Sequence, residues 1–64
     1  MTYHVLYKKF DGSVNGVDVS AKSRESALDK ALYDVIPAKE GEMPYKAWVV
    51  SVTYQNGNYK LFVK

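Results

Sequence analysis

The 64-residue sequence contains no cysteine and only one histidine, His4. Without cysteine, the protein has no disulfide framework, no thiolate zinc site and no cysteine nucleophile. No hydrophobic run approaches the ~20 residues of a membrane-spanning helix. The N-terminus, MTYHVLYKKF, also lacks the apolar region of a signal peptide. We therefore expect a cytoplasmic protein that does not enter a membrane.

The sequence also lacks a catalytic or metal-binding pattern. Neither glycine-rich phosphate-binding motif occurs, and the serines have no recognisable nucleophile context. Glu40 and Glu42 are too few to hold a cation that needs several oxygen ligands. A lone histidine such as His4 on a half-exposed strand is more often structural than catalytic. We predict that the protein is not an enzyme and uses no cofactor, metal or small-molecule substrate.

What the sequence does contain is typical of one small folded domain over residues 1–64. Hydrophobic residues make up 47% of the chain, and six are tyrosine, which argues against disorder. A chain of this length buries only about 60% of the surface that its unfolded form exposes, so the stability of a monomer should be marginal. The net charge of +2 permits a nucleic-acid partner without requiring one.

The order of local patterns predicts strand, strand, helix, strand, strand. Residues 2–10 and 17–22 are rich in strand formers, and either Asp11-Gly12 or Asn15-Gly16 could close the turn between them. Ser23 is a suitable helix N-cap. Over residues 24–36 apolar side chains recur at helical spacing, and Pro37 is expected to end the helix. Residues 38–45 are expected to form a loop.

The C-terminal residues 46–64 predict a β-hairpin that turns at Asn56-Gly57. This pair favours a two-residue type I′ loop, which would place Tyr54 opposite Tyr59 and Val52 opposite Leu61. Because side chains alternate along a strand, one face of this hairpin is predicted to be almost wholly apolar. That face collects Trp48, Val50, Val52, Tyr54, Tyr59, Leu61 and Val63.

These elements predict an α+β fold of ββαββ type, in which a four-stranded, mainly antiparallel sheet has one helix packed on one face. The first strand is expected to direct Tyr3, Val5 and Tyr7 towards the helix. One helix covers only one face, so the other face must meet solvent or a partner. The residues predicted for that open face are His4, Leu6, Lys8, Phe10, Asp18, Ser20, Val49, Ser51, Thr53, Lys60, Phe62 and Lys64.

Apolar residues and lysines are interleaved on the predicted open face, and this pattern favours a protein–protein interaction module. The partner could be another protein or a second copy of the chain, because a small domain gains stability by pairing a half-apolar face. Tyr33, on the polar side of the helix, is a further candidate contact, since tyrosine is common at binding hot spots. The predicted partner-binding residues are Lys8, Phe10, Tyr33, Val49, Lys60, Phe62 and Lys64.

The same face allows an alternative, a module that binds single-stranded RNA or DNA. Phe10 and Phe62 would stack on bases, while Lys8, Lys60 and Lys64 would contact phosphates.

The opening of the helix carries an A-x-S-x-x-x-A-L pattern, formed by Ala21, Ser23, Ala27 and Leu28. It resembles the ββα opening of many small bacterial and phage α/β proteins, without indicating one family. A short cysteine-free protein of this kind, of phage or mobile-element type, would be expected to act by docking on another protein.

Overall fold

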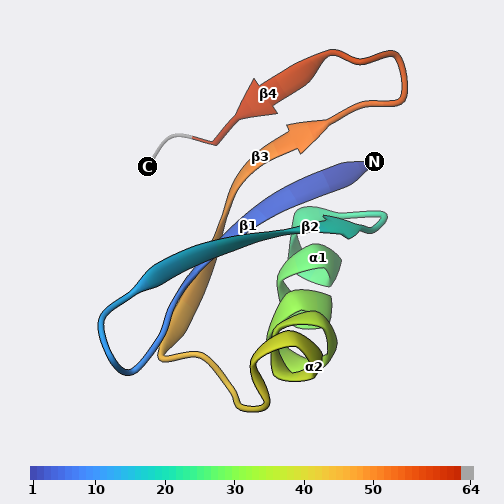
Figure 1. Ribbon diagram of the computed structural model, residues 1–64. Helices are drawn as coiled ribbons and strands as arrows, with labels where there is room; N and C mark the ends of the chain where they lie inside the picture. Colours follow the sequence, from blue (N-terminus) through green and yellow to red (C-terminus); the bar gives the residue numbers. More distant parts are fainter. Residues whose placement is uncertain (63–64) are drawn as a thin grey trace.

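The computed structural model describes residues 1–62 and confirms the predicted α+β fold (Figure 1). Four strands form one antiparallel sheet in the order β2-β1-β3-β4, and a helical segment covers one of its faces. The elements in chain order are β1 (Thr2–Lys8), β2 (Val14–Ser20), α1 (Arg24–Lys30), η1 (Ala31–Val35), α2 (Ile36–Glu40), β3 (Lys46–Thr53) and β4 (Tyr59–Leu61).

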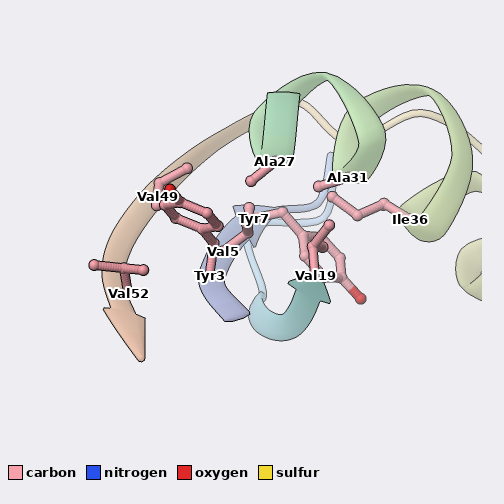
Figure 2. Close-up of a cluster of buried hydrophobic side chains, with 9 residues drawn as sticks. All are labelled: Tyr3, Val5, Tyr7, Val19, Ala27, Ala31, Ile36, Val49 and Val52. Carbon is pink, nitrogen blue, oxygen red and sulfur yellow. The ribbon is translucent and has the colours of Figure 1, made fainter. Parts of the chain in front are cut away.

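The core lies between the helical segment and the inner face of the sheet, and β1 crosses its centre (Figure 2). Tyr3, Val5 and Tyr7 point inward from β1, as predicted, and Val5 and Tyr7 have no exposed surface. The remaining buried residues come from β2, β3 and the helix, and they are Val19, Ala27, Ala31, Ile36, Val49 and Val52.

The helical segment begins where the sequence predicts but ends later. Ser23 is the N-cap, and its Oγ accepts a hydrogen bond from the amide of Ser26 at 3.1 Å. The prediction that Pro37 ends the helix, and that residues 38–40 belong to a loop, is wrong. α2 continues to Glu40 and ends at Gly41, whose φ of 81° closes the last turn.

Pro37 is accommodated by a π-helical turn, η1, directly before α2. The amide of Ile36 bonds to the carbonyl of Ala31, five residues back instead of four. In a regular helix the proline ring would clash with the carbonyl of Tyr33 and leave it without a donor. The wider turn removes this conflict and places Pro37 in the first turn of α2, where proline is favoured.

Asp11-Gly12, and not Asn15-Gly16, closes the first hairpin. The amide of Lys9 bonds to the carbonyl of Ser13 at 2.8 Å, and that of Gly12 bonds to the carbonyl of Lys9 at 3.0 Å. Gly12 has a φ of 91°, the positive value of a three-residue loop with a glycine bulge. Residues 15 and 16 therefore lie inside β2, which begins before the predicted start at residue 17.

The second hairpin uses the same loop, so its predicted two-residue turn is wrong. Tyr54 donates to Asn58 at 2.7 Å, and Gly57 donates to Tyr54 at 3.0 Å. A type I′ turn needs positive φ at both central residues, but Asn56 does not have it and Gly57 does. The longer loop shifts the register by one residue, so that Thr53 pairs with Tyr59.

A β-bulge in β3 changes the faces of that strand. Val5 pairs with Val49 and His4 with Ser51, so Val50 is an extra residue between them. Val49 therefore points into the core, and Trp48 points to the opposite face. The prediction had these two residues reversed, whereas Val52 is inward and Ser51 and Thr53 are outward as expected.

Candidate functional site

The helical segment leaves the opposite face of the sheet uncovered, and we call this face the open face (Figure 1). Its members follow from the strand register, because residues that pair across strands share a face. They are Thr2, His4, Leu6 and Lys8 of β1; Val14, Gly16, Asp18 and Ser20 of β2; Lys46, Trp48, Ser51 and Thr53 of β3; and Tyr59 and Leu61 of β4.

Apolar side chains occupy the centre of the open face and its β4 margin. Leu6 and Trp48 are half-buried and form a cross-strand pair between the two central strands. At the margin, Tyr59 and Leu61 remain 69% and 62% exposed. Aromatic and aliphatic residues on neighbouring strands of an uncovered sheet face form a surface that a partner could desolvate.

Two lysines lie together at one end of the open face. Lys8 and Lys46 are directly paired across β1 and β3, an arrangement in which like charges repel. The Nζ atom of Lys46 is 5.5 Å from the centre of the Trp48 ring, within cation–π range. Neither lysine is ion-paired with a carboxylate of residues 1–62. This end of the face would therefore suit an acidic group.

The other half of the open face has an internal hydrogen bond. Nδ1 of His4 lies 2.7 Å from a carboxylate oxygen of Asp18 on the neighbouring strand. The imidazole lies over Gly16, where an added Cβ would be 3.0 Å from Cε1 of His4 and 3.1 Å from Cδ2 of Leu6. A glycine at this position therefore allows both side chains to lie against β2.

A second exposed group lies at the tip of the first hairpin. Phe10 is 70% exposed and meets the ring of Tyr45 edge-on, with ring centres 5.6 Å apart. The two rings border a shallow cavity of about 330 Å³, whose other lining residues are Lys8, Lys9, Asp11 and Gly12. A hydrogen bond from Ser13 lowers the pKa of the Asp11 carboxyl and stabilises the loop.

One polar contact links the end of α2 to the covered face of the sheet. The Tyr7 hydroxyl donates to Glu40, whose other carboxylate oxygen lies 3.3 Å from Nζ of Lys9. Burial, followed by the contact with Glu40, raises the pKa of Tyr7 to about 12. The hydrogen bond from Tyr7 lowers the pKa of Glu40, and the carboxylate raises that of Lys9. The shifted pKa values of Tyr7, Glu40 and Lys9 follow from burial and this contact, so we assign the three residues a structural role.

The predicted partner-binding residues do not gather on one surface. Lys8 lies on the open face, Phe10 at the hairpin tip, and Tyr33 on the helix with 71% exposure. The placement of Val49 and Phe62 on the open face is wrong. Val49 is 4% exposed, and Phe62 packs on the core, stacked on Tyr3 with ring centres 6.5 Å apart.

The register also corrects the placement of Lys60, and the remaining residue is not described. Lys60 pairs with Val52 and so belongs to the covered side, although it is exposed beyond the helix. Lys64 lies outside residues 1–62. The guanidinium of Arg24 lies 4.3 Å from the Phe62 ring centre, which shows that Phe62 is held on the helix side.

The prediction missed seven residues of the open face, which are Thr2, Val14, Gly16, Lys46, Trp48, Tyr59 and Leu61. In the AWVVSV segment both alternating sets contain two or more apolar residues, so the pattern does not reveal where a bulge exchanges the two faces. The two-residue and three-residue loops both use the Asn-Gly pair. Trp48 itself was the available signal, because tryptophan is enriched at binding hot spots.

Within residues 1–62, no three His, Asp or Glu side chains come together as a metal site. In the same part of the chain, none of the helices has the length and apolar character needed to span a membrane. Comparison with protein-family models, curated proteins and solved structures found no match.

Proposed function

We propose that the protein is a non-enzymatic interaction module that docks a protein partner on its open face. The observation that carries this proposal is the uncovered pair Leu6 and Trp48, extended to the margin by Leu61 and Tyr59. Burying such a surface against a partner is favourable at about 25 cal/mol per Å² of apolar area. Aromatic anchors in this setting are typical of binding hot spots.

The charges at one end of the open face support a partner of defined chemistry. Lys8 and Lys46 repel each other across the strands, and a carboxylate between them would relieve this repulsion. Trp48 lies next to this end, under Lys46. We infer that the partner presents an apolar side chain to Trp48 and an acidic side chain to the two lysines. Electrostatic complementarity of this kind sets the orientation and association rate of a complex.

Site-directed photocrosslinking tests the proposal whatever the identity of the partner. p-Benzoylphenylalanine is placed at Tyr59, on the open face, or at Tyr33, on the helix, in cells that make the protein. Both positions are exposed tyrosines in the parent chain, so they form a matched pair. We expect a defined protein adduct from position 59 and none of that mass from position 33.

Charge reversal then tests the role of the lysines. With Lys8→Glu and Lys46→Glu combined, the adduct at position 59 should fall at least tenfold, while the far-ultraviolet circular dichroism spectrum stays unchanged. Adducts that form equally from position 33, or that survive the charge reversal in a folded variant, would contradict the proposal.

Binding of single-stranded nucleic acid is the second candidate function, and residues of the same face support it. Trp48 and Tyr59 lie on an open sheet face with Lys8 and Lys46, and base stacking on aromatic side chains contributes about 1–3 kcal/mol per base. Titration with ten-residue oligomers of deoxythymidine and uridine, followed by Trp48 fluorescence, tests it. Binding that weakens steeply with salt would favour this function. Unchanged fluorescence at low salt would exclude it for these oligomers.

A further inference from the structure

The outer edge of β2 is a second surface that the fold leaves unpaired. β2 is at the end of the sheet, and among residues 1–62 it pairs with β1 alone (Figure 1). It has seven residues, whereas β4, at the other edge, has three. A long edge strand exposes a row of backbone donors and acceptors that can pair with another strand.

The hydrogen bonds of the first hairpin show which groups point outward. Lys9 donates to Ser13, and Ala21 donates to Met1, so these two pairs are hydrogen-bonded. Bonded and non-bonded pairs alternate along an antiparallel ladder. Every second residue of β2 therefore directs its amide and carbonyl away from β1. These residues are Val14, Gly16, Asp18 and Ser20.

The β2 edge has few of the features that prevent edge-to-edge pairing. Its sequence, VNGVDVS, has no proline, lysine or arginine, and the bulge of this sheet lies in β3. One charged residue, Asp18, is present, and Lys30 reaches the carbonyl of Ser20 at 3.4 Å. Protected edges usually carry lysine, proline or a bulge, or are very short, as β4 is.

We propose that two copies of the chain pair through β2 in an antiparallel, two-fold symmetric dimer centred on Val17. In this register Val14 faces Ser20 of the second copy, and Gly16 faces its Asp18. The outward amides and carbonyls of β2 then all lie in hydrogen-bonded pairs between the two copies. If the centre shifts by one residue, at least one outward residue faces a position outside β2 of the second copy. The result is one continuous sheet with both open faces on the same side.

Side chains complement each other in the same register. The imidazole of His4 lies over Gly16, so Asp18 of the second copy would approach this ring. On the covered side Val17 would meet Val17 of the second copy at the symmetry axis. Val17 is half-buried in the monomer, and this contact would cover its remaining surface. The alternative centre at residue 18 would instead oppose two Asp18 carboxylates, which repel.

A cysteine scan tests the register, because the natural chain has no cysteine. In the proposed dimer, residue 17 faces itself in a non-bonded pair with Cα atoms ~4.5 Å apart, within the range of a disulfide. Under mild oxidation Val17→Cys should form a covalent dimer. The control, Ser20→Cys, places the thiol opposite residue 14 of the second copy. It should give at least tenfold less covalent dimer than Val17→Cys.

Equilibrium measurements on the unmodified chain test the association itself. We expect sedimentation equilibrium to show a reversible dimer below 1 mM. Asp18→Pro removes an outward amide and should give a monomer, while Leu61→Pro does the same at the β4 edge and should leave the dimer intact. A check by circular dichroism confirms that each variant is folded.

Three results would overturn the proposal. One is a natural chain that remains monomeric at 1 mM. Another is equal crosslinking from positions 17 and 20. The third is a dimer that Leu61→Pro abolishes, which would assign the contact to β4. None of these results bears on partner docking at the open face, which the photocrosslinking experiment tests separately.

Discussion

The two faces of this sheet differ in the part they play, although both carry aliphatic and aromatic residues. On the covered face, Val5, Val19 and Val49 are almost fully buried under the helix. On the open face, Leu6 and Trp48 are only partly buried and Leu61 is largely exposed. The fold thus obtains its stability from one face, and a comparable set of side chains on the other remains available to a partner.

The largest predicted effect is in the core between the covered face and the helix. Ile36→Ala should lower the free energy of unfolding by about 2–5 kcal/mol, because Ile36 is fully buried and the cavity cannot be filled by solvent. Leu61→Ala on the open face should change it by less than about 0.5 kcal/mol. Urea denaturation measures both. A cost at Leu61 that equals the cost at Ile36 would contradict the contrast between the faces.

The two hairpin glycines sharpen the contrast, because they adopt the same backbone conformation. Gly12→Ala and Gly57→Ala each place a side chain at a φ near 90°, which costs about 1–2 kcal/mol. Gly12 joins β1 to β2 and should lower global stability. Gly57 joins β3 to the exposed strand β4, so its cost should appear mainly as faster amide exchange in β4. Native-state hydrogen exchange distinguishes the two, and equal global losses would contradict this account.

The hydroxyl of Tyr7 is a polar group at the end of the covered face. Tyr7→Phe removes its hydrogen bond to Glu40 and should cost about 1–2 kcal/mol at pH 7. The pKa of about 12 in the folded state exceeds the usual value of 10.0. The contribution of the protonated hydroxyl is therefore complete below pH 10 and lost as the pH rises to 12. The phenylalanine variant should lack that alkaline loss, and identical alkaline profiles would contradict the assignment.

The smallest effect concerns the lysine pair on the open face. Lys46→Gln removes the repulsion from Lys8 and should raise the free energy of unfolding by at most about 0.5 kcal/mol at low salt. The control Lys39→Gln, on an exposed turn of α2, should not produce this gain. Thermal denaturation at two salt concentrations measures the difference. A destabilised Lys46→Gln variant would show that Lys46 contributes mainly through Trp48.

The fold was predictable because most elements carry one unambiguous pattern. β1 alternates between Tyr3, Val5 and Tyr7 on one side and residues that include His4 on the other, and Ser23 marks the helix start. The predicted core positions Ala27, Ala31 and Ile36 of the helix are all buried. Ala27 and Ala31 are one regular turn apart, whereas the five-residue step from Ala31 to Ile36 spans the π-turn.

The open face and the end of the helix were harder to predict, because three local features depart from regular strand and helix patterns. The extra residue Val50 moves Trp48 outward and Val49 inward. The three-residue loop at Gly57 shifts β4, so that Leu61 lies outward and Phe62 packs on the core. The π-turn before Pro37 extends the helix and brings Glu40 to Tyr7. A regular two-residue or 3.6-residue period contains none of these features.

The central claim is that the open face around Trp48 receives the partner. Its most direct test is a nuclear magnetic resonance titration of the ¹⁵N-labelled protein with the partner segment identified by photocrosslinking. Trp48 is the only tryptophan, so its indole N–H gives one resonance. The account predicts large shifts of this resonance and of amides in β1, β3 and β4. Shifts confined to residues 24–40 of the helix, with the indole unchanged, would contradict it.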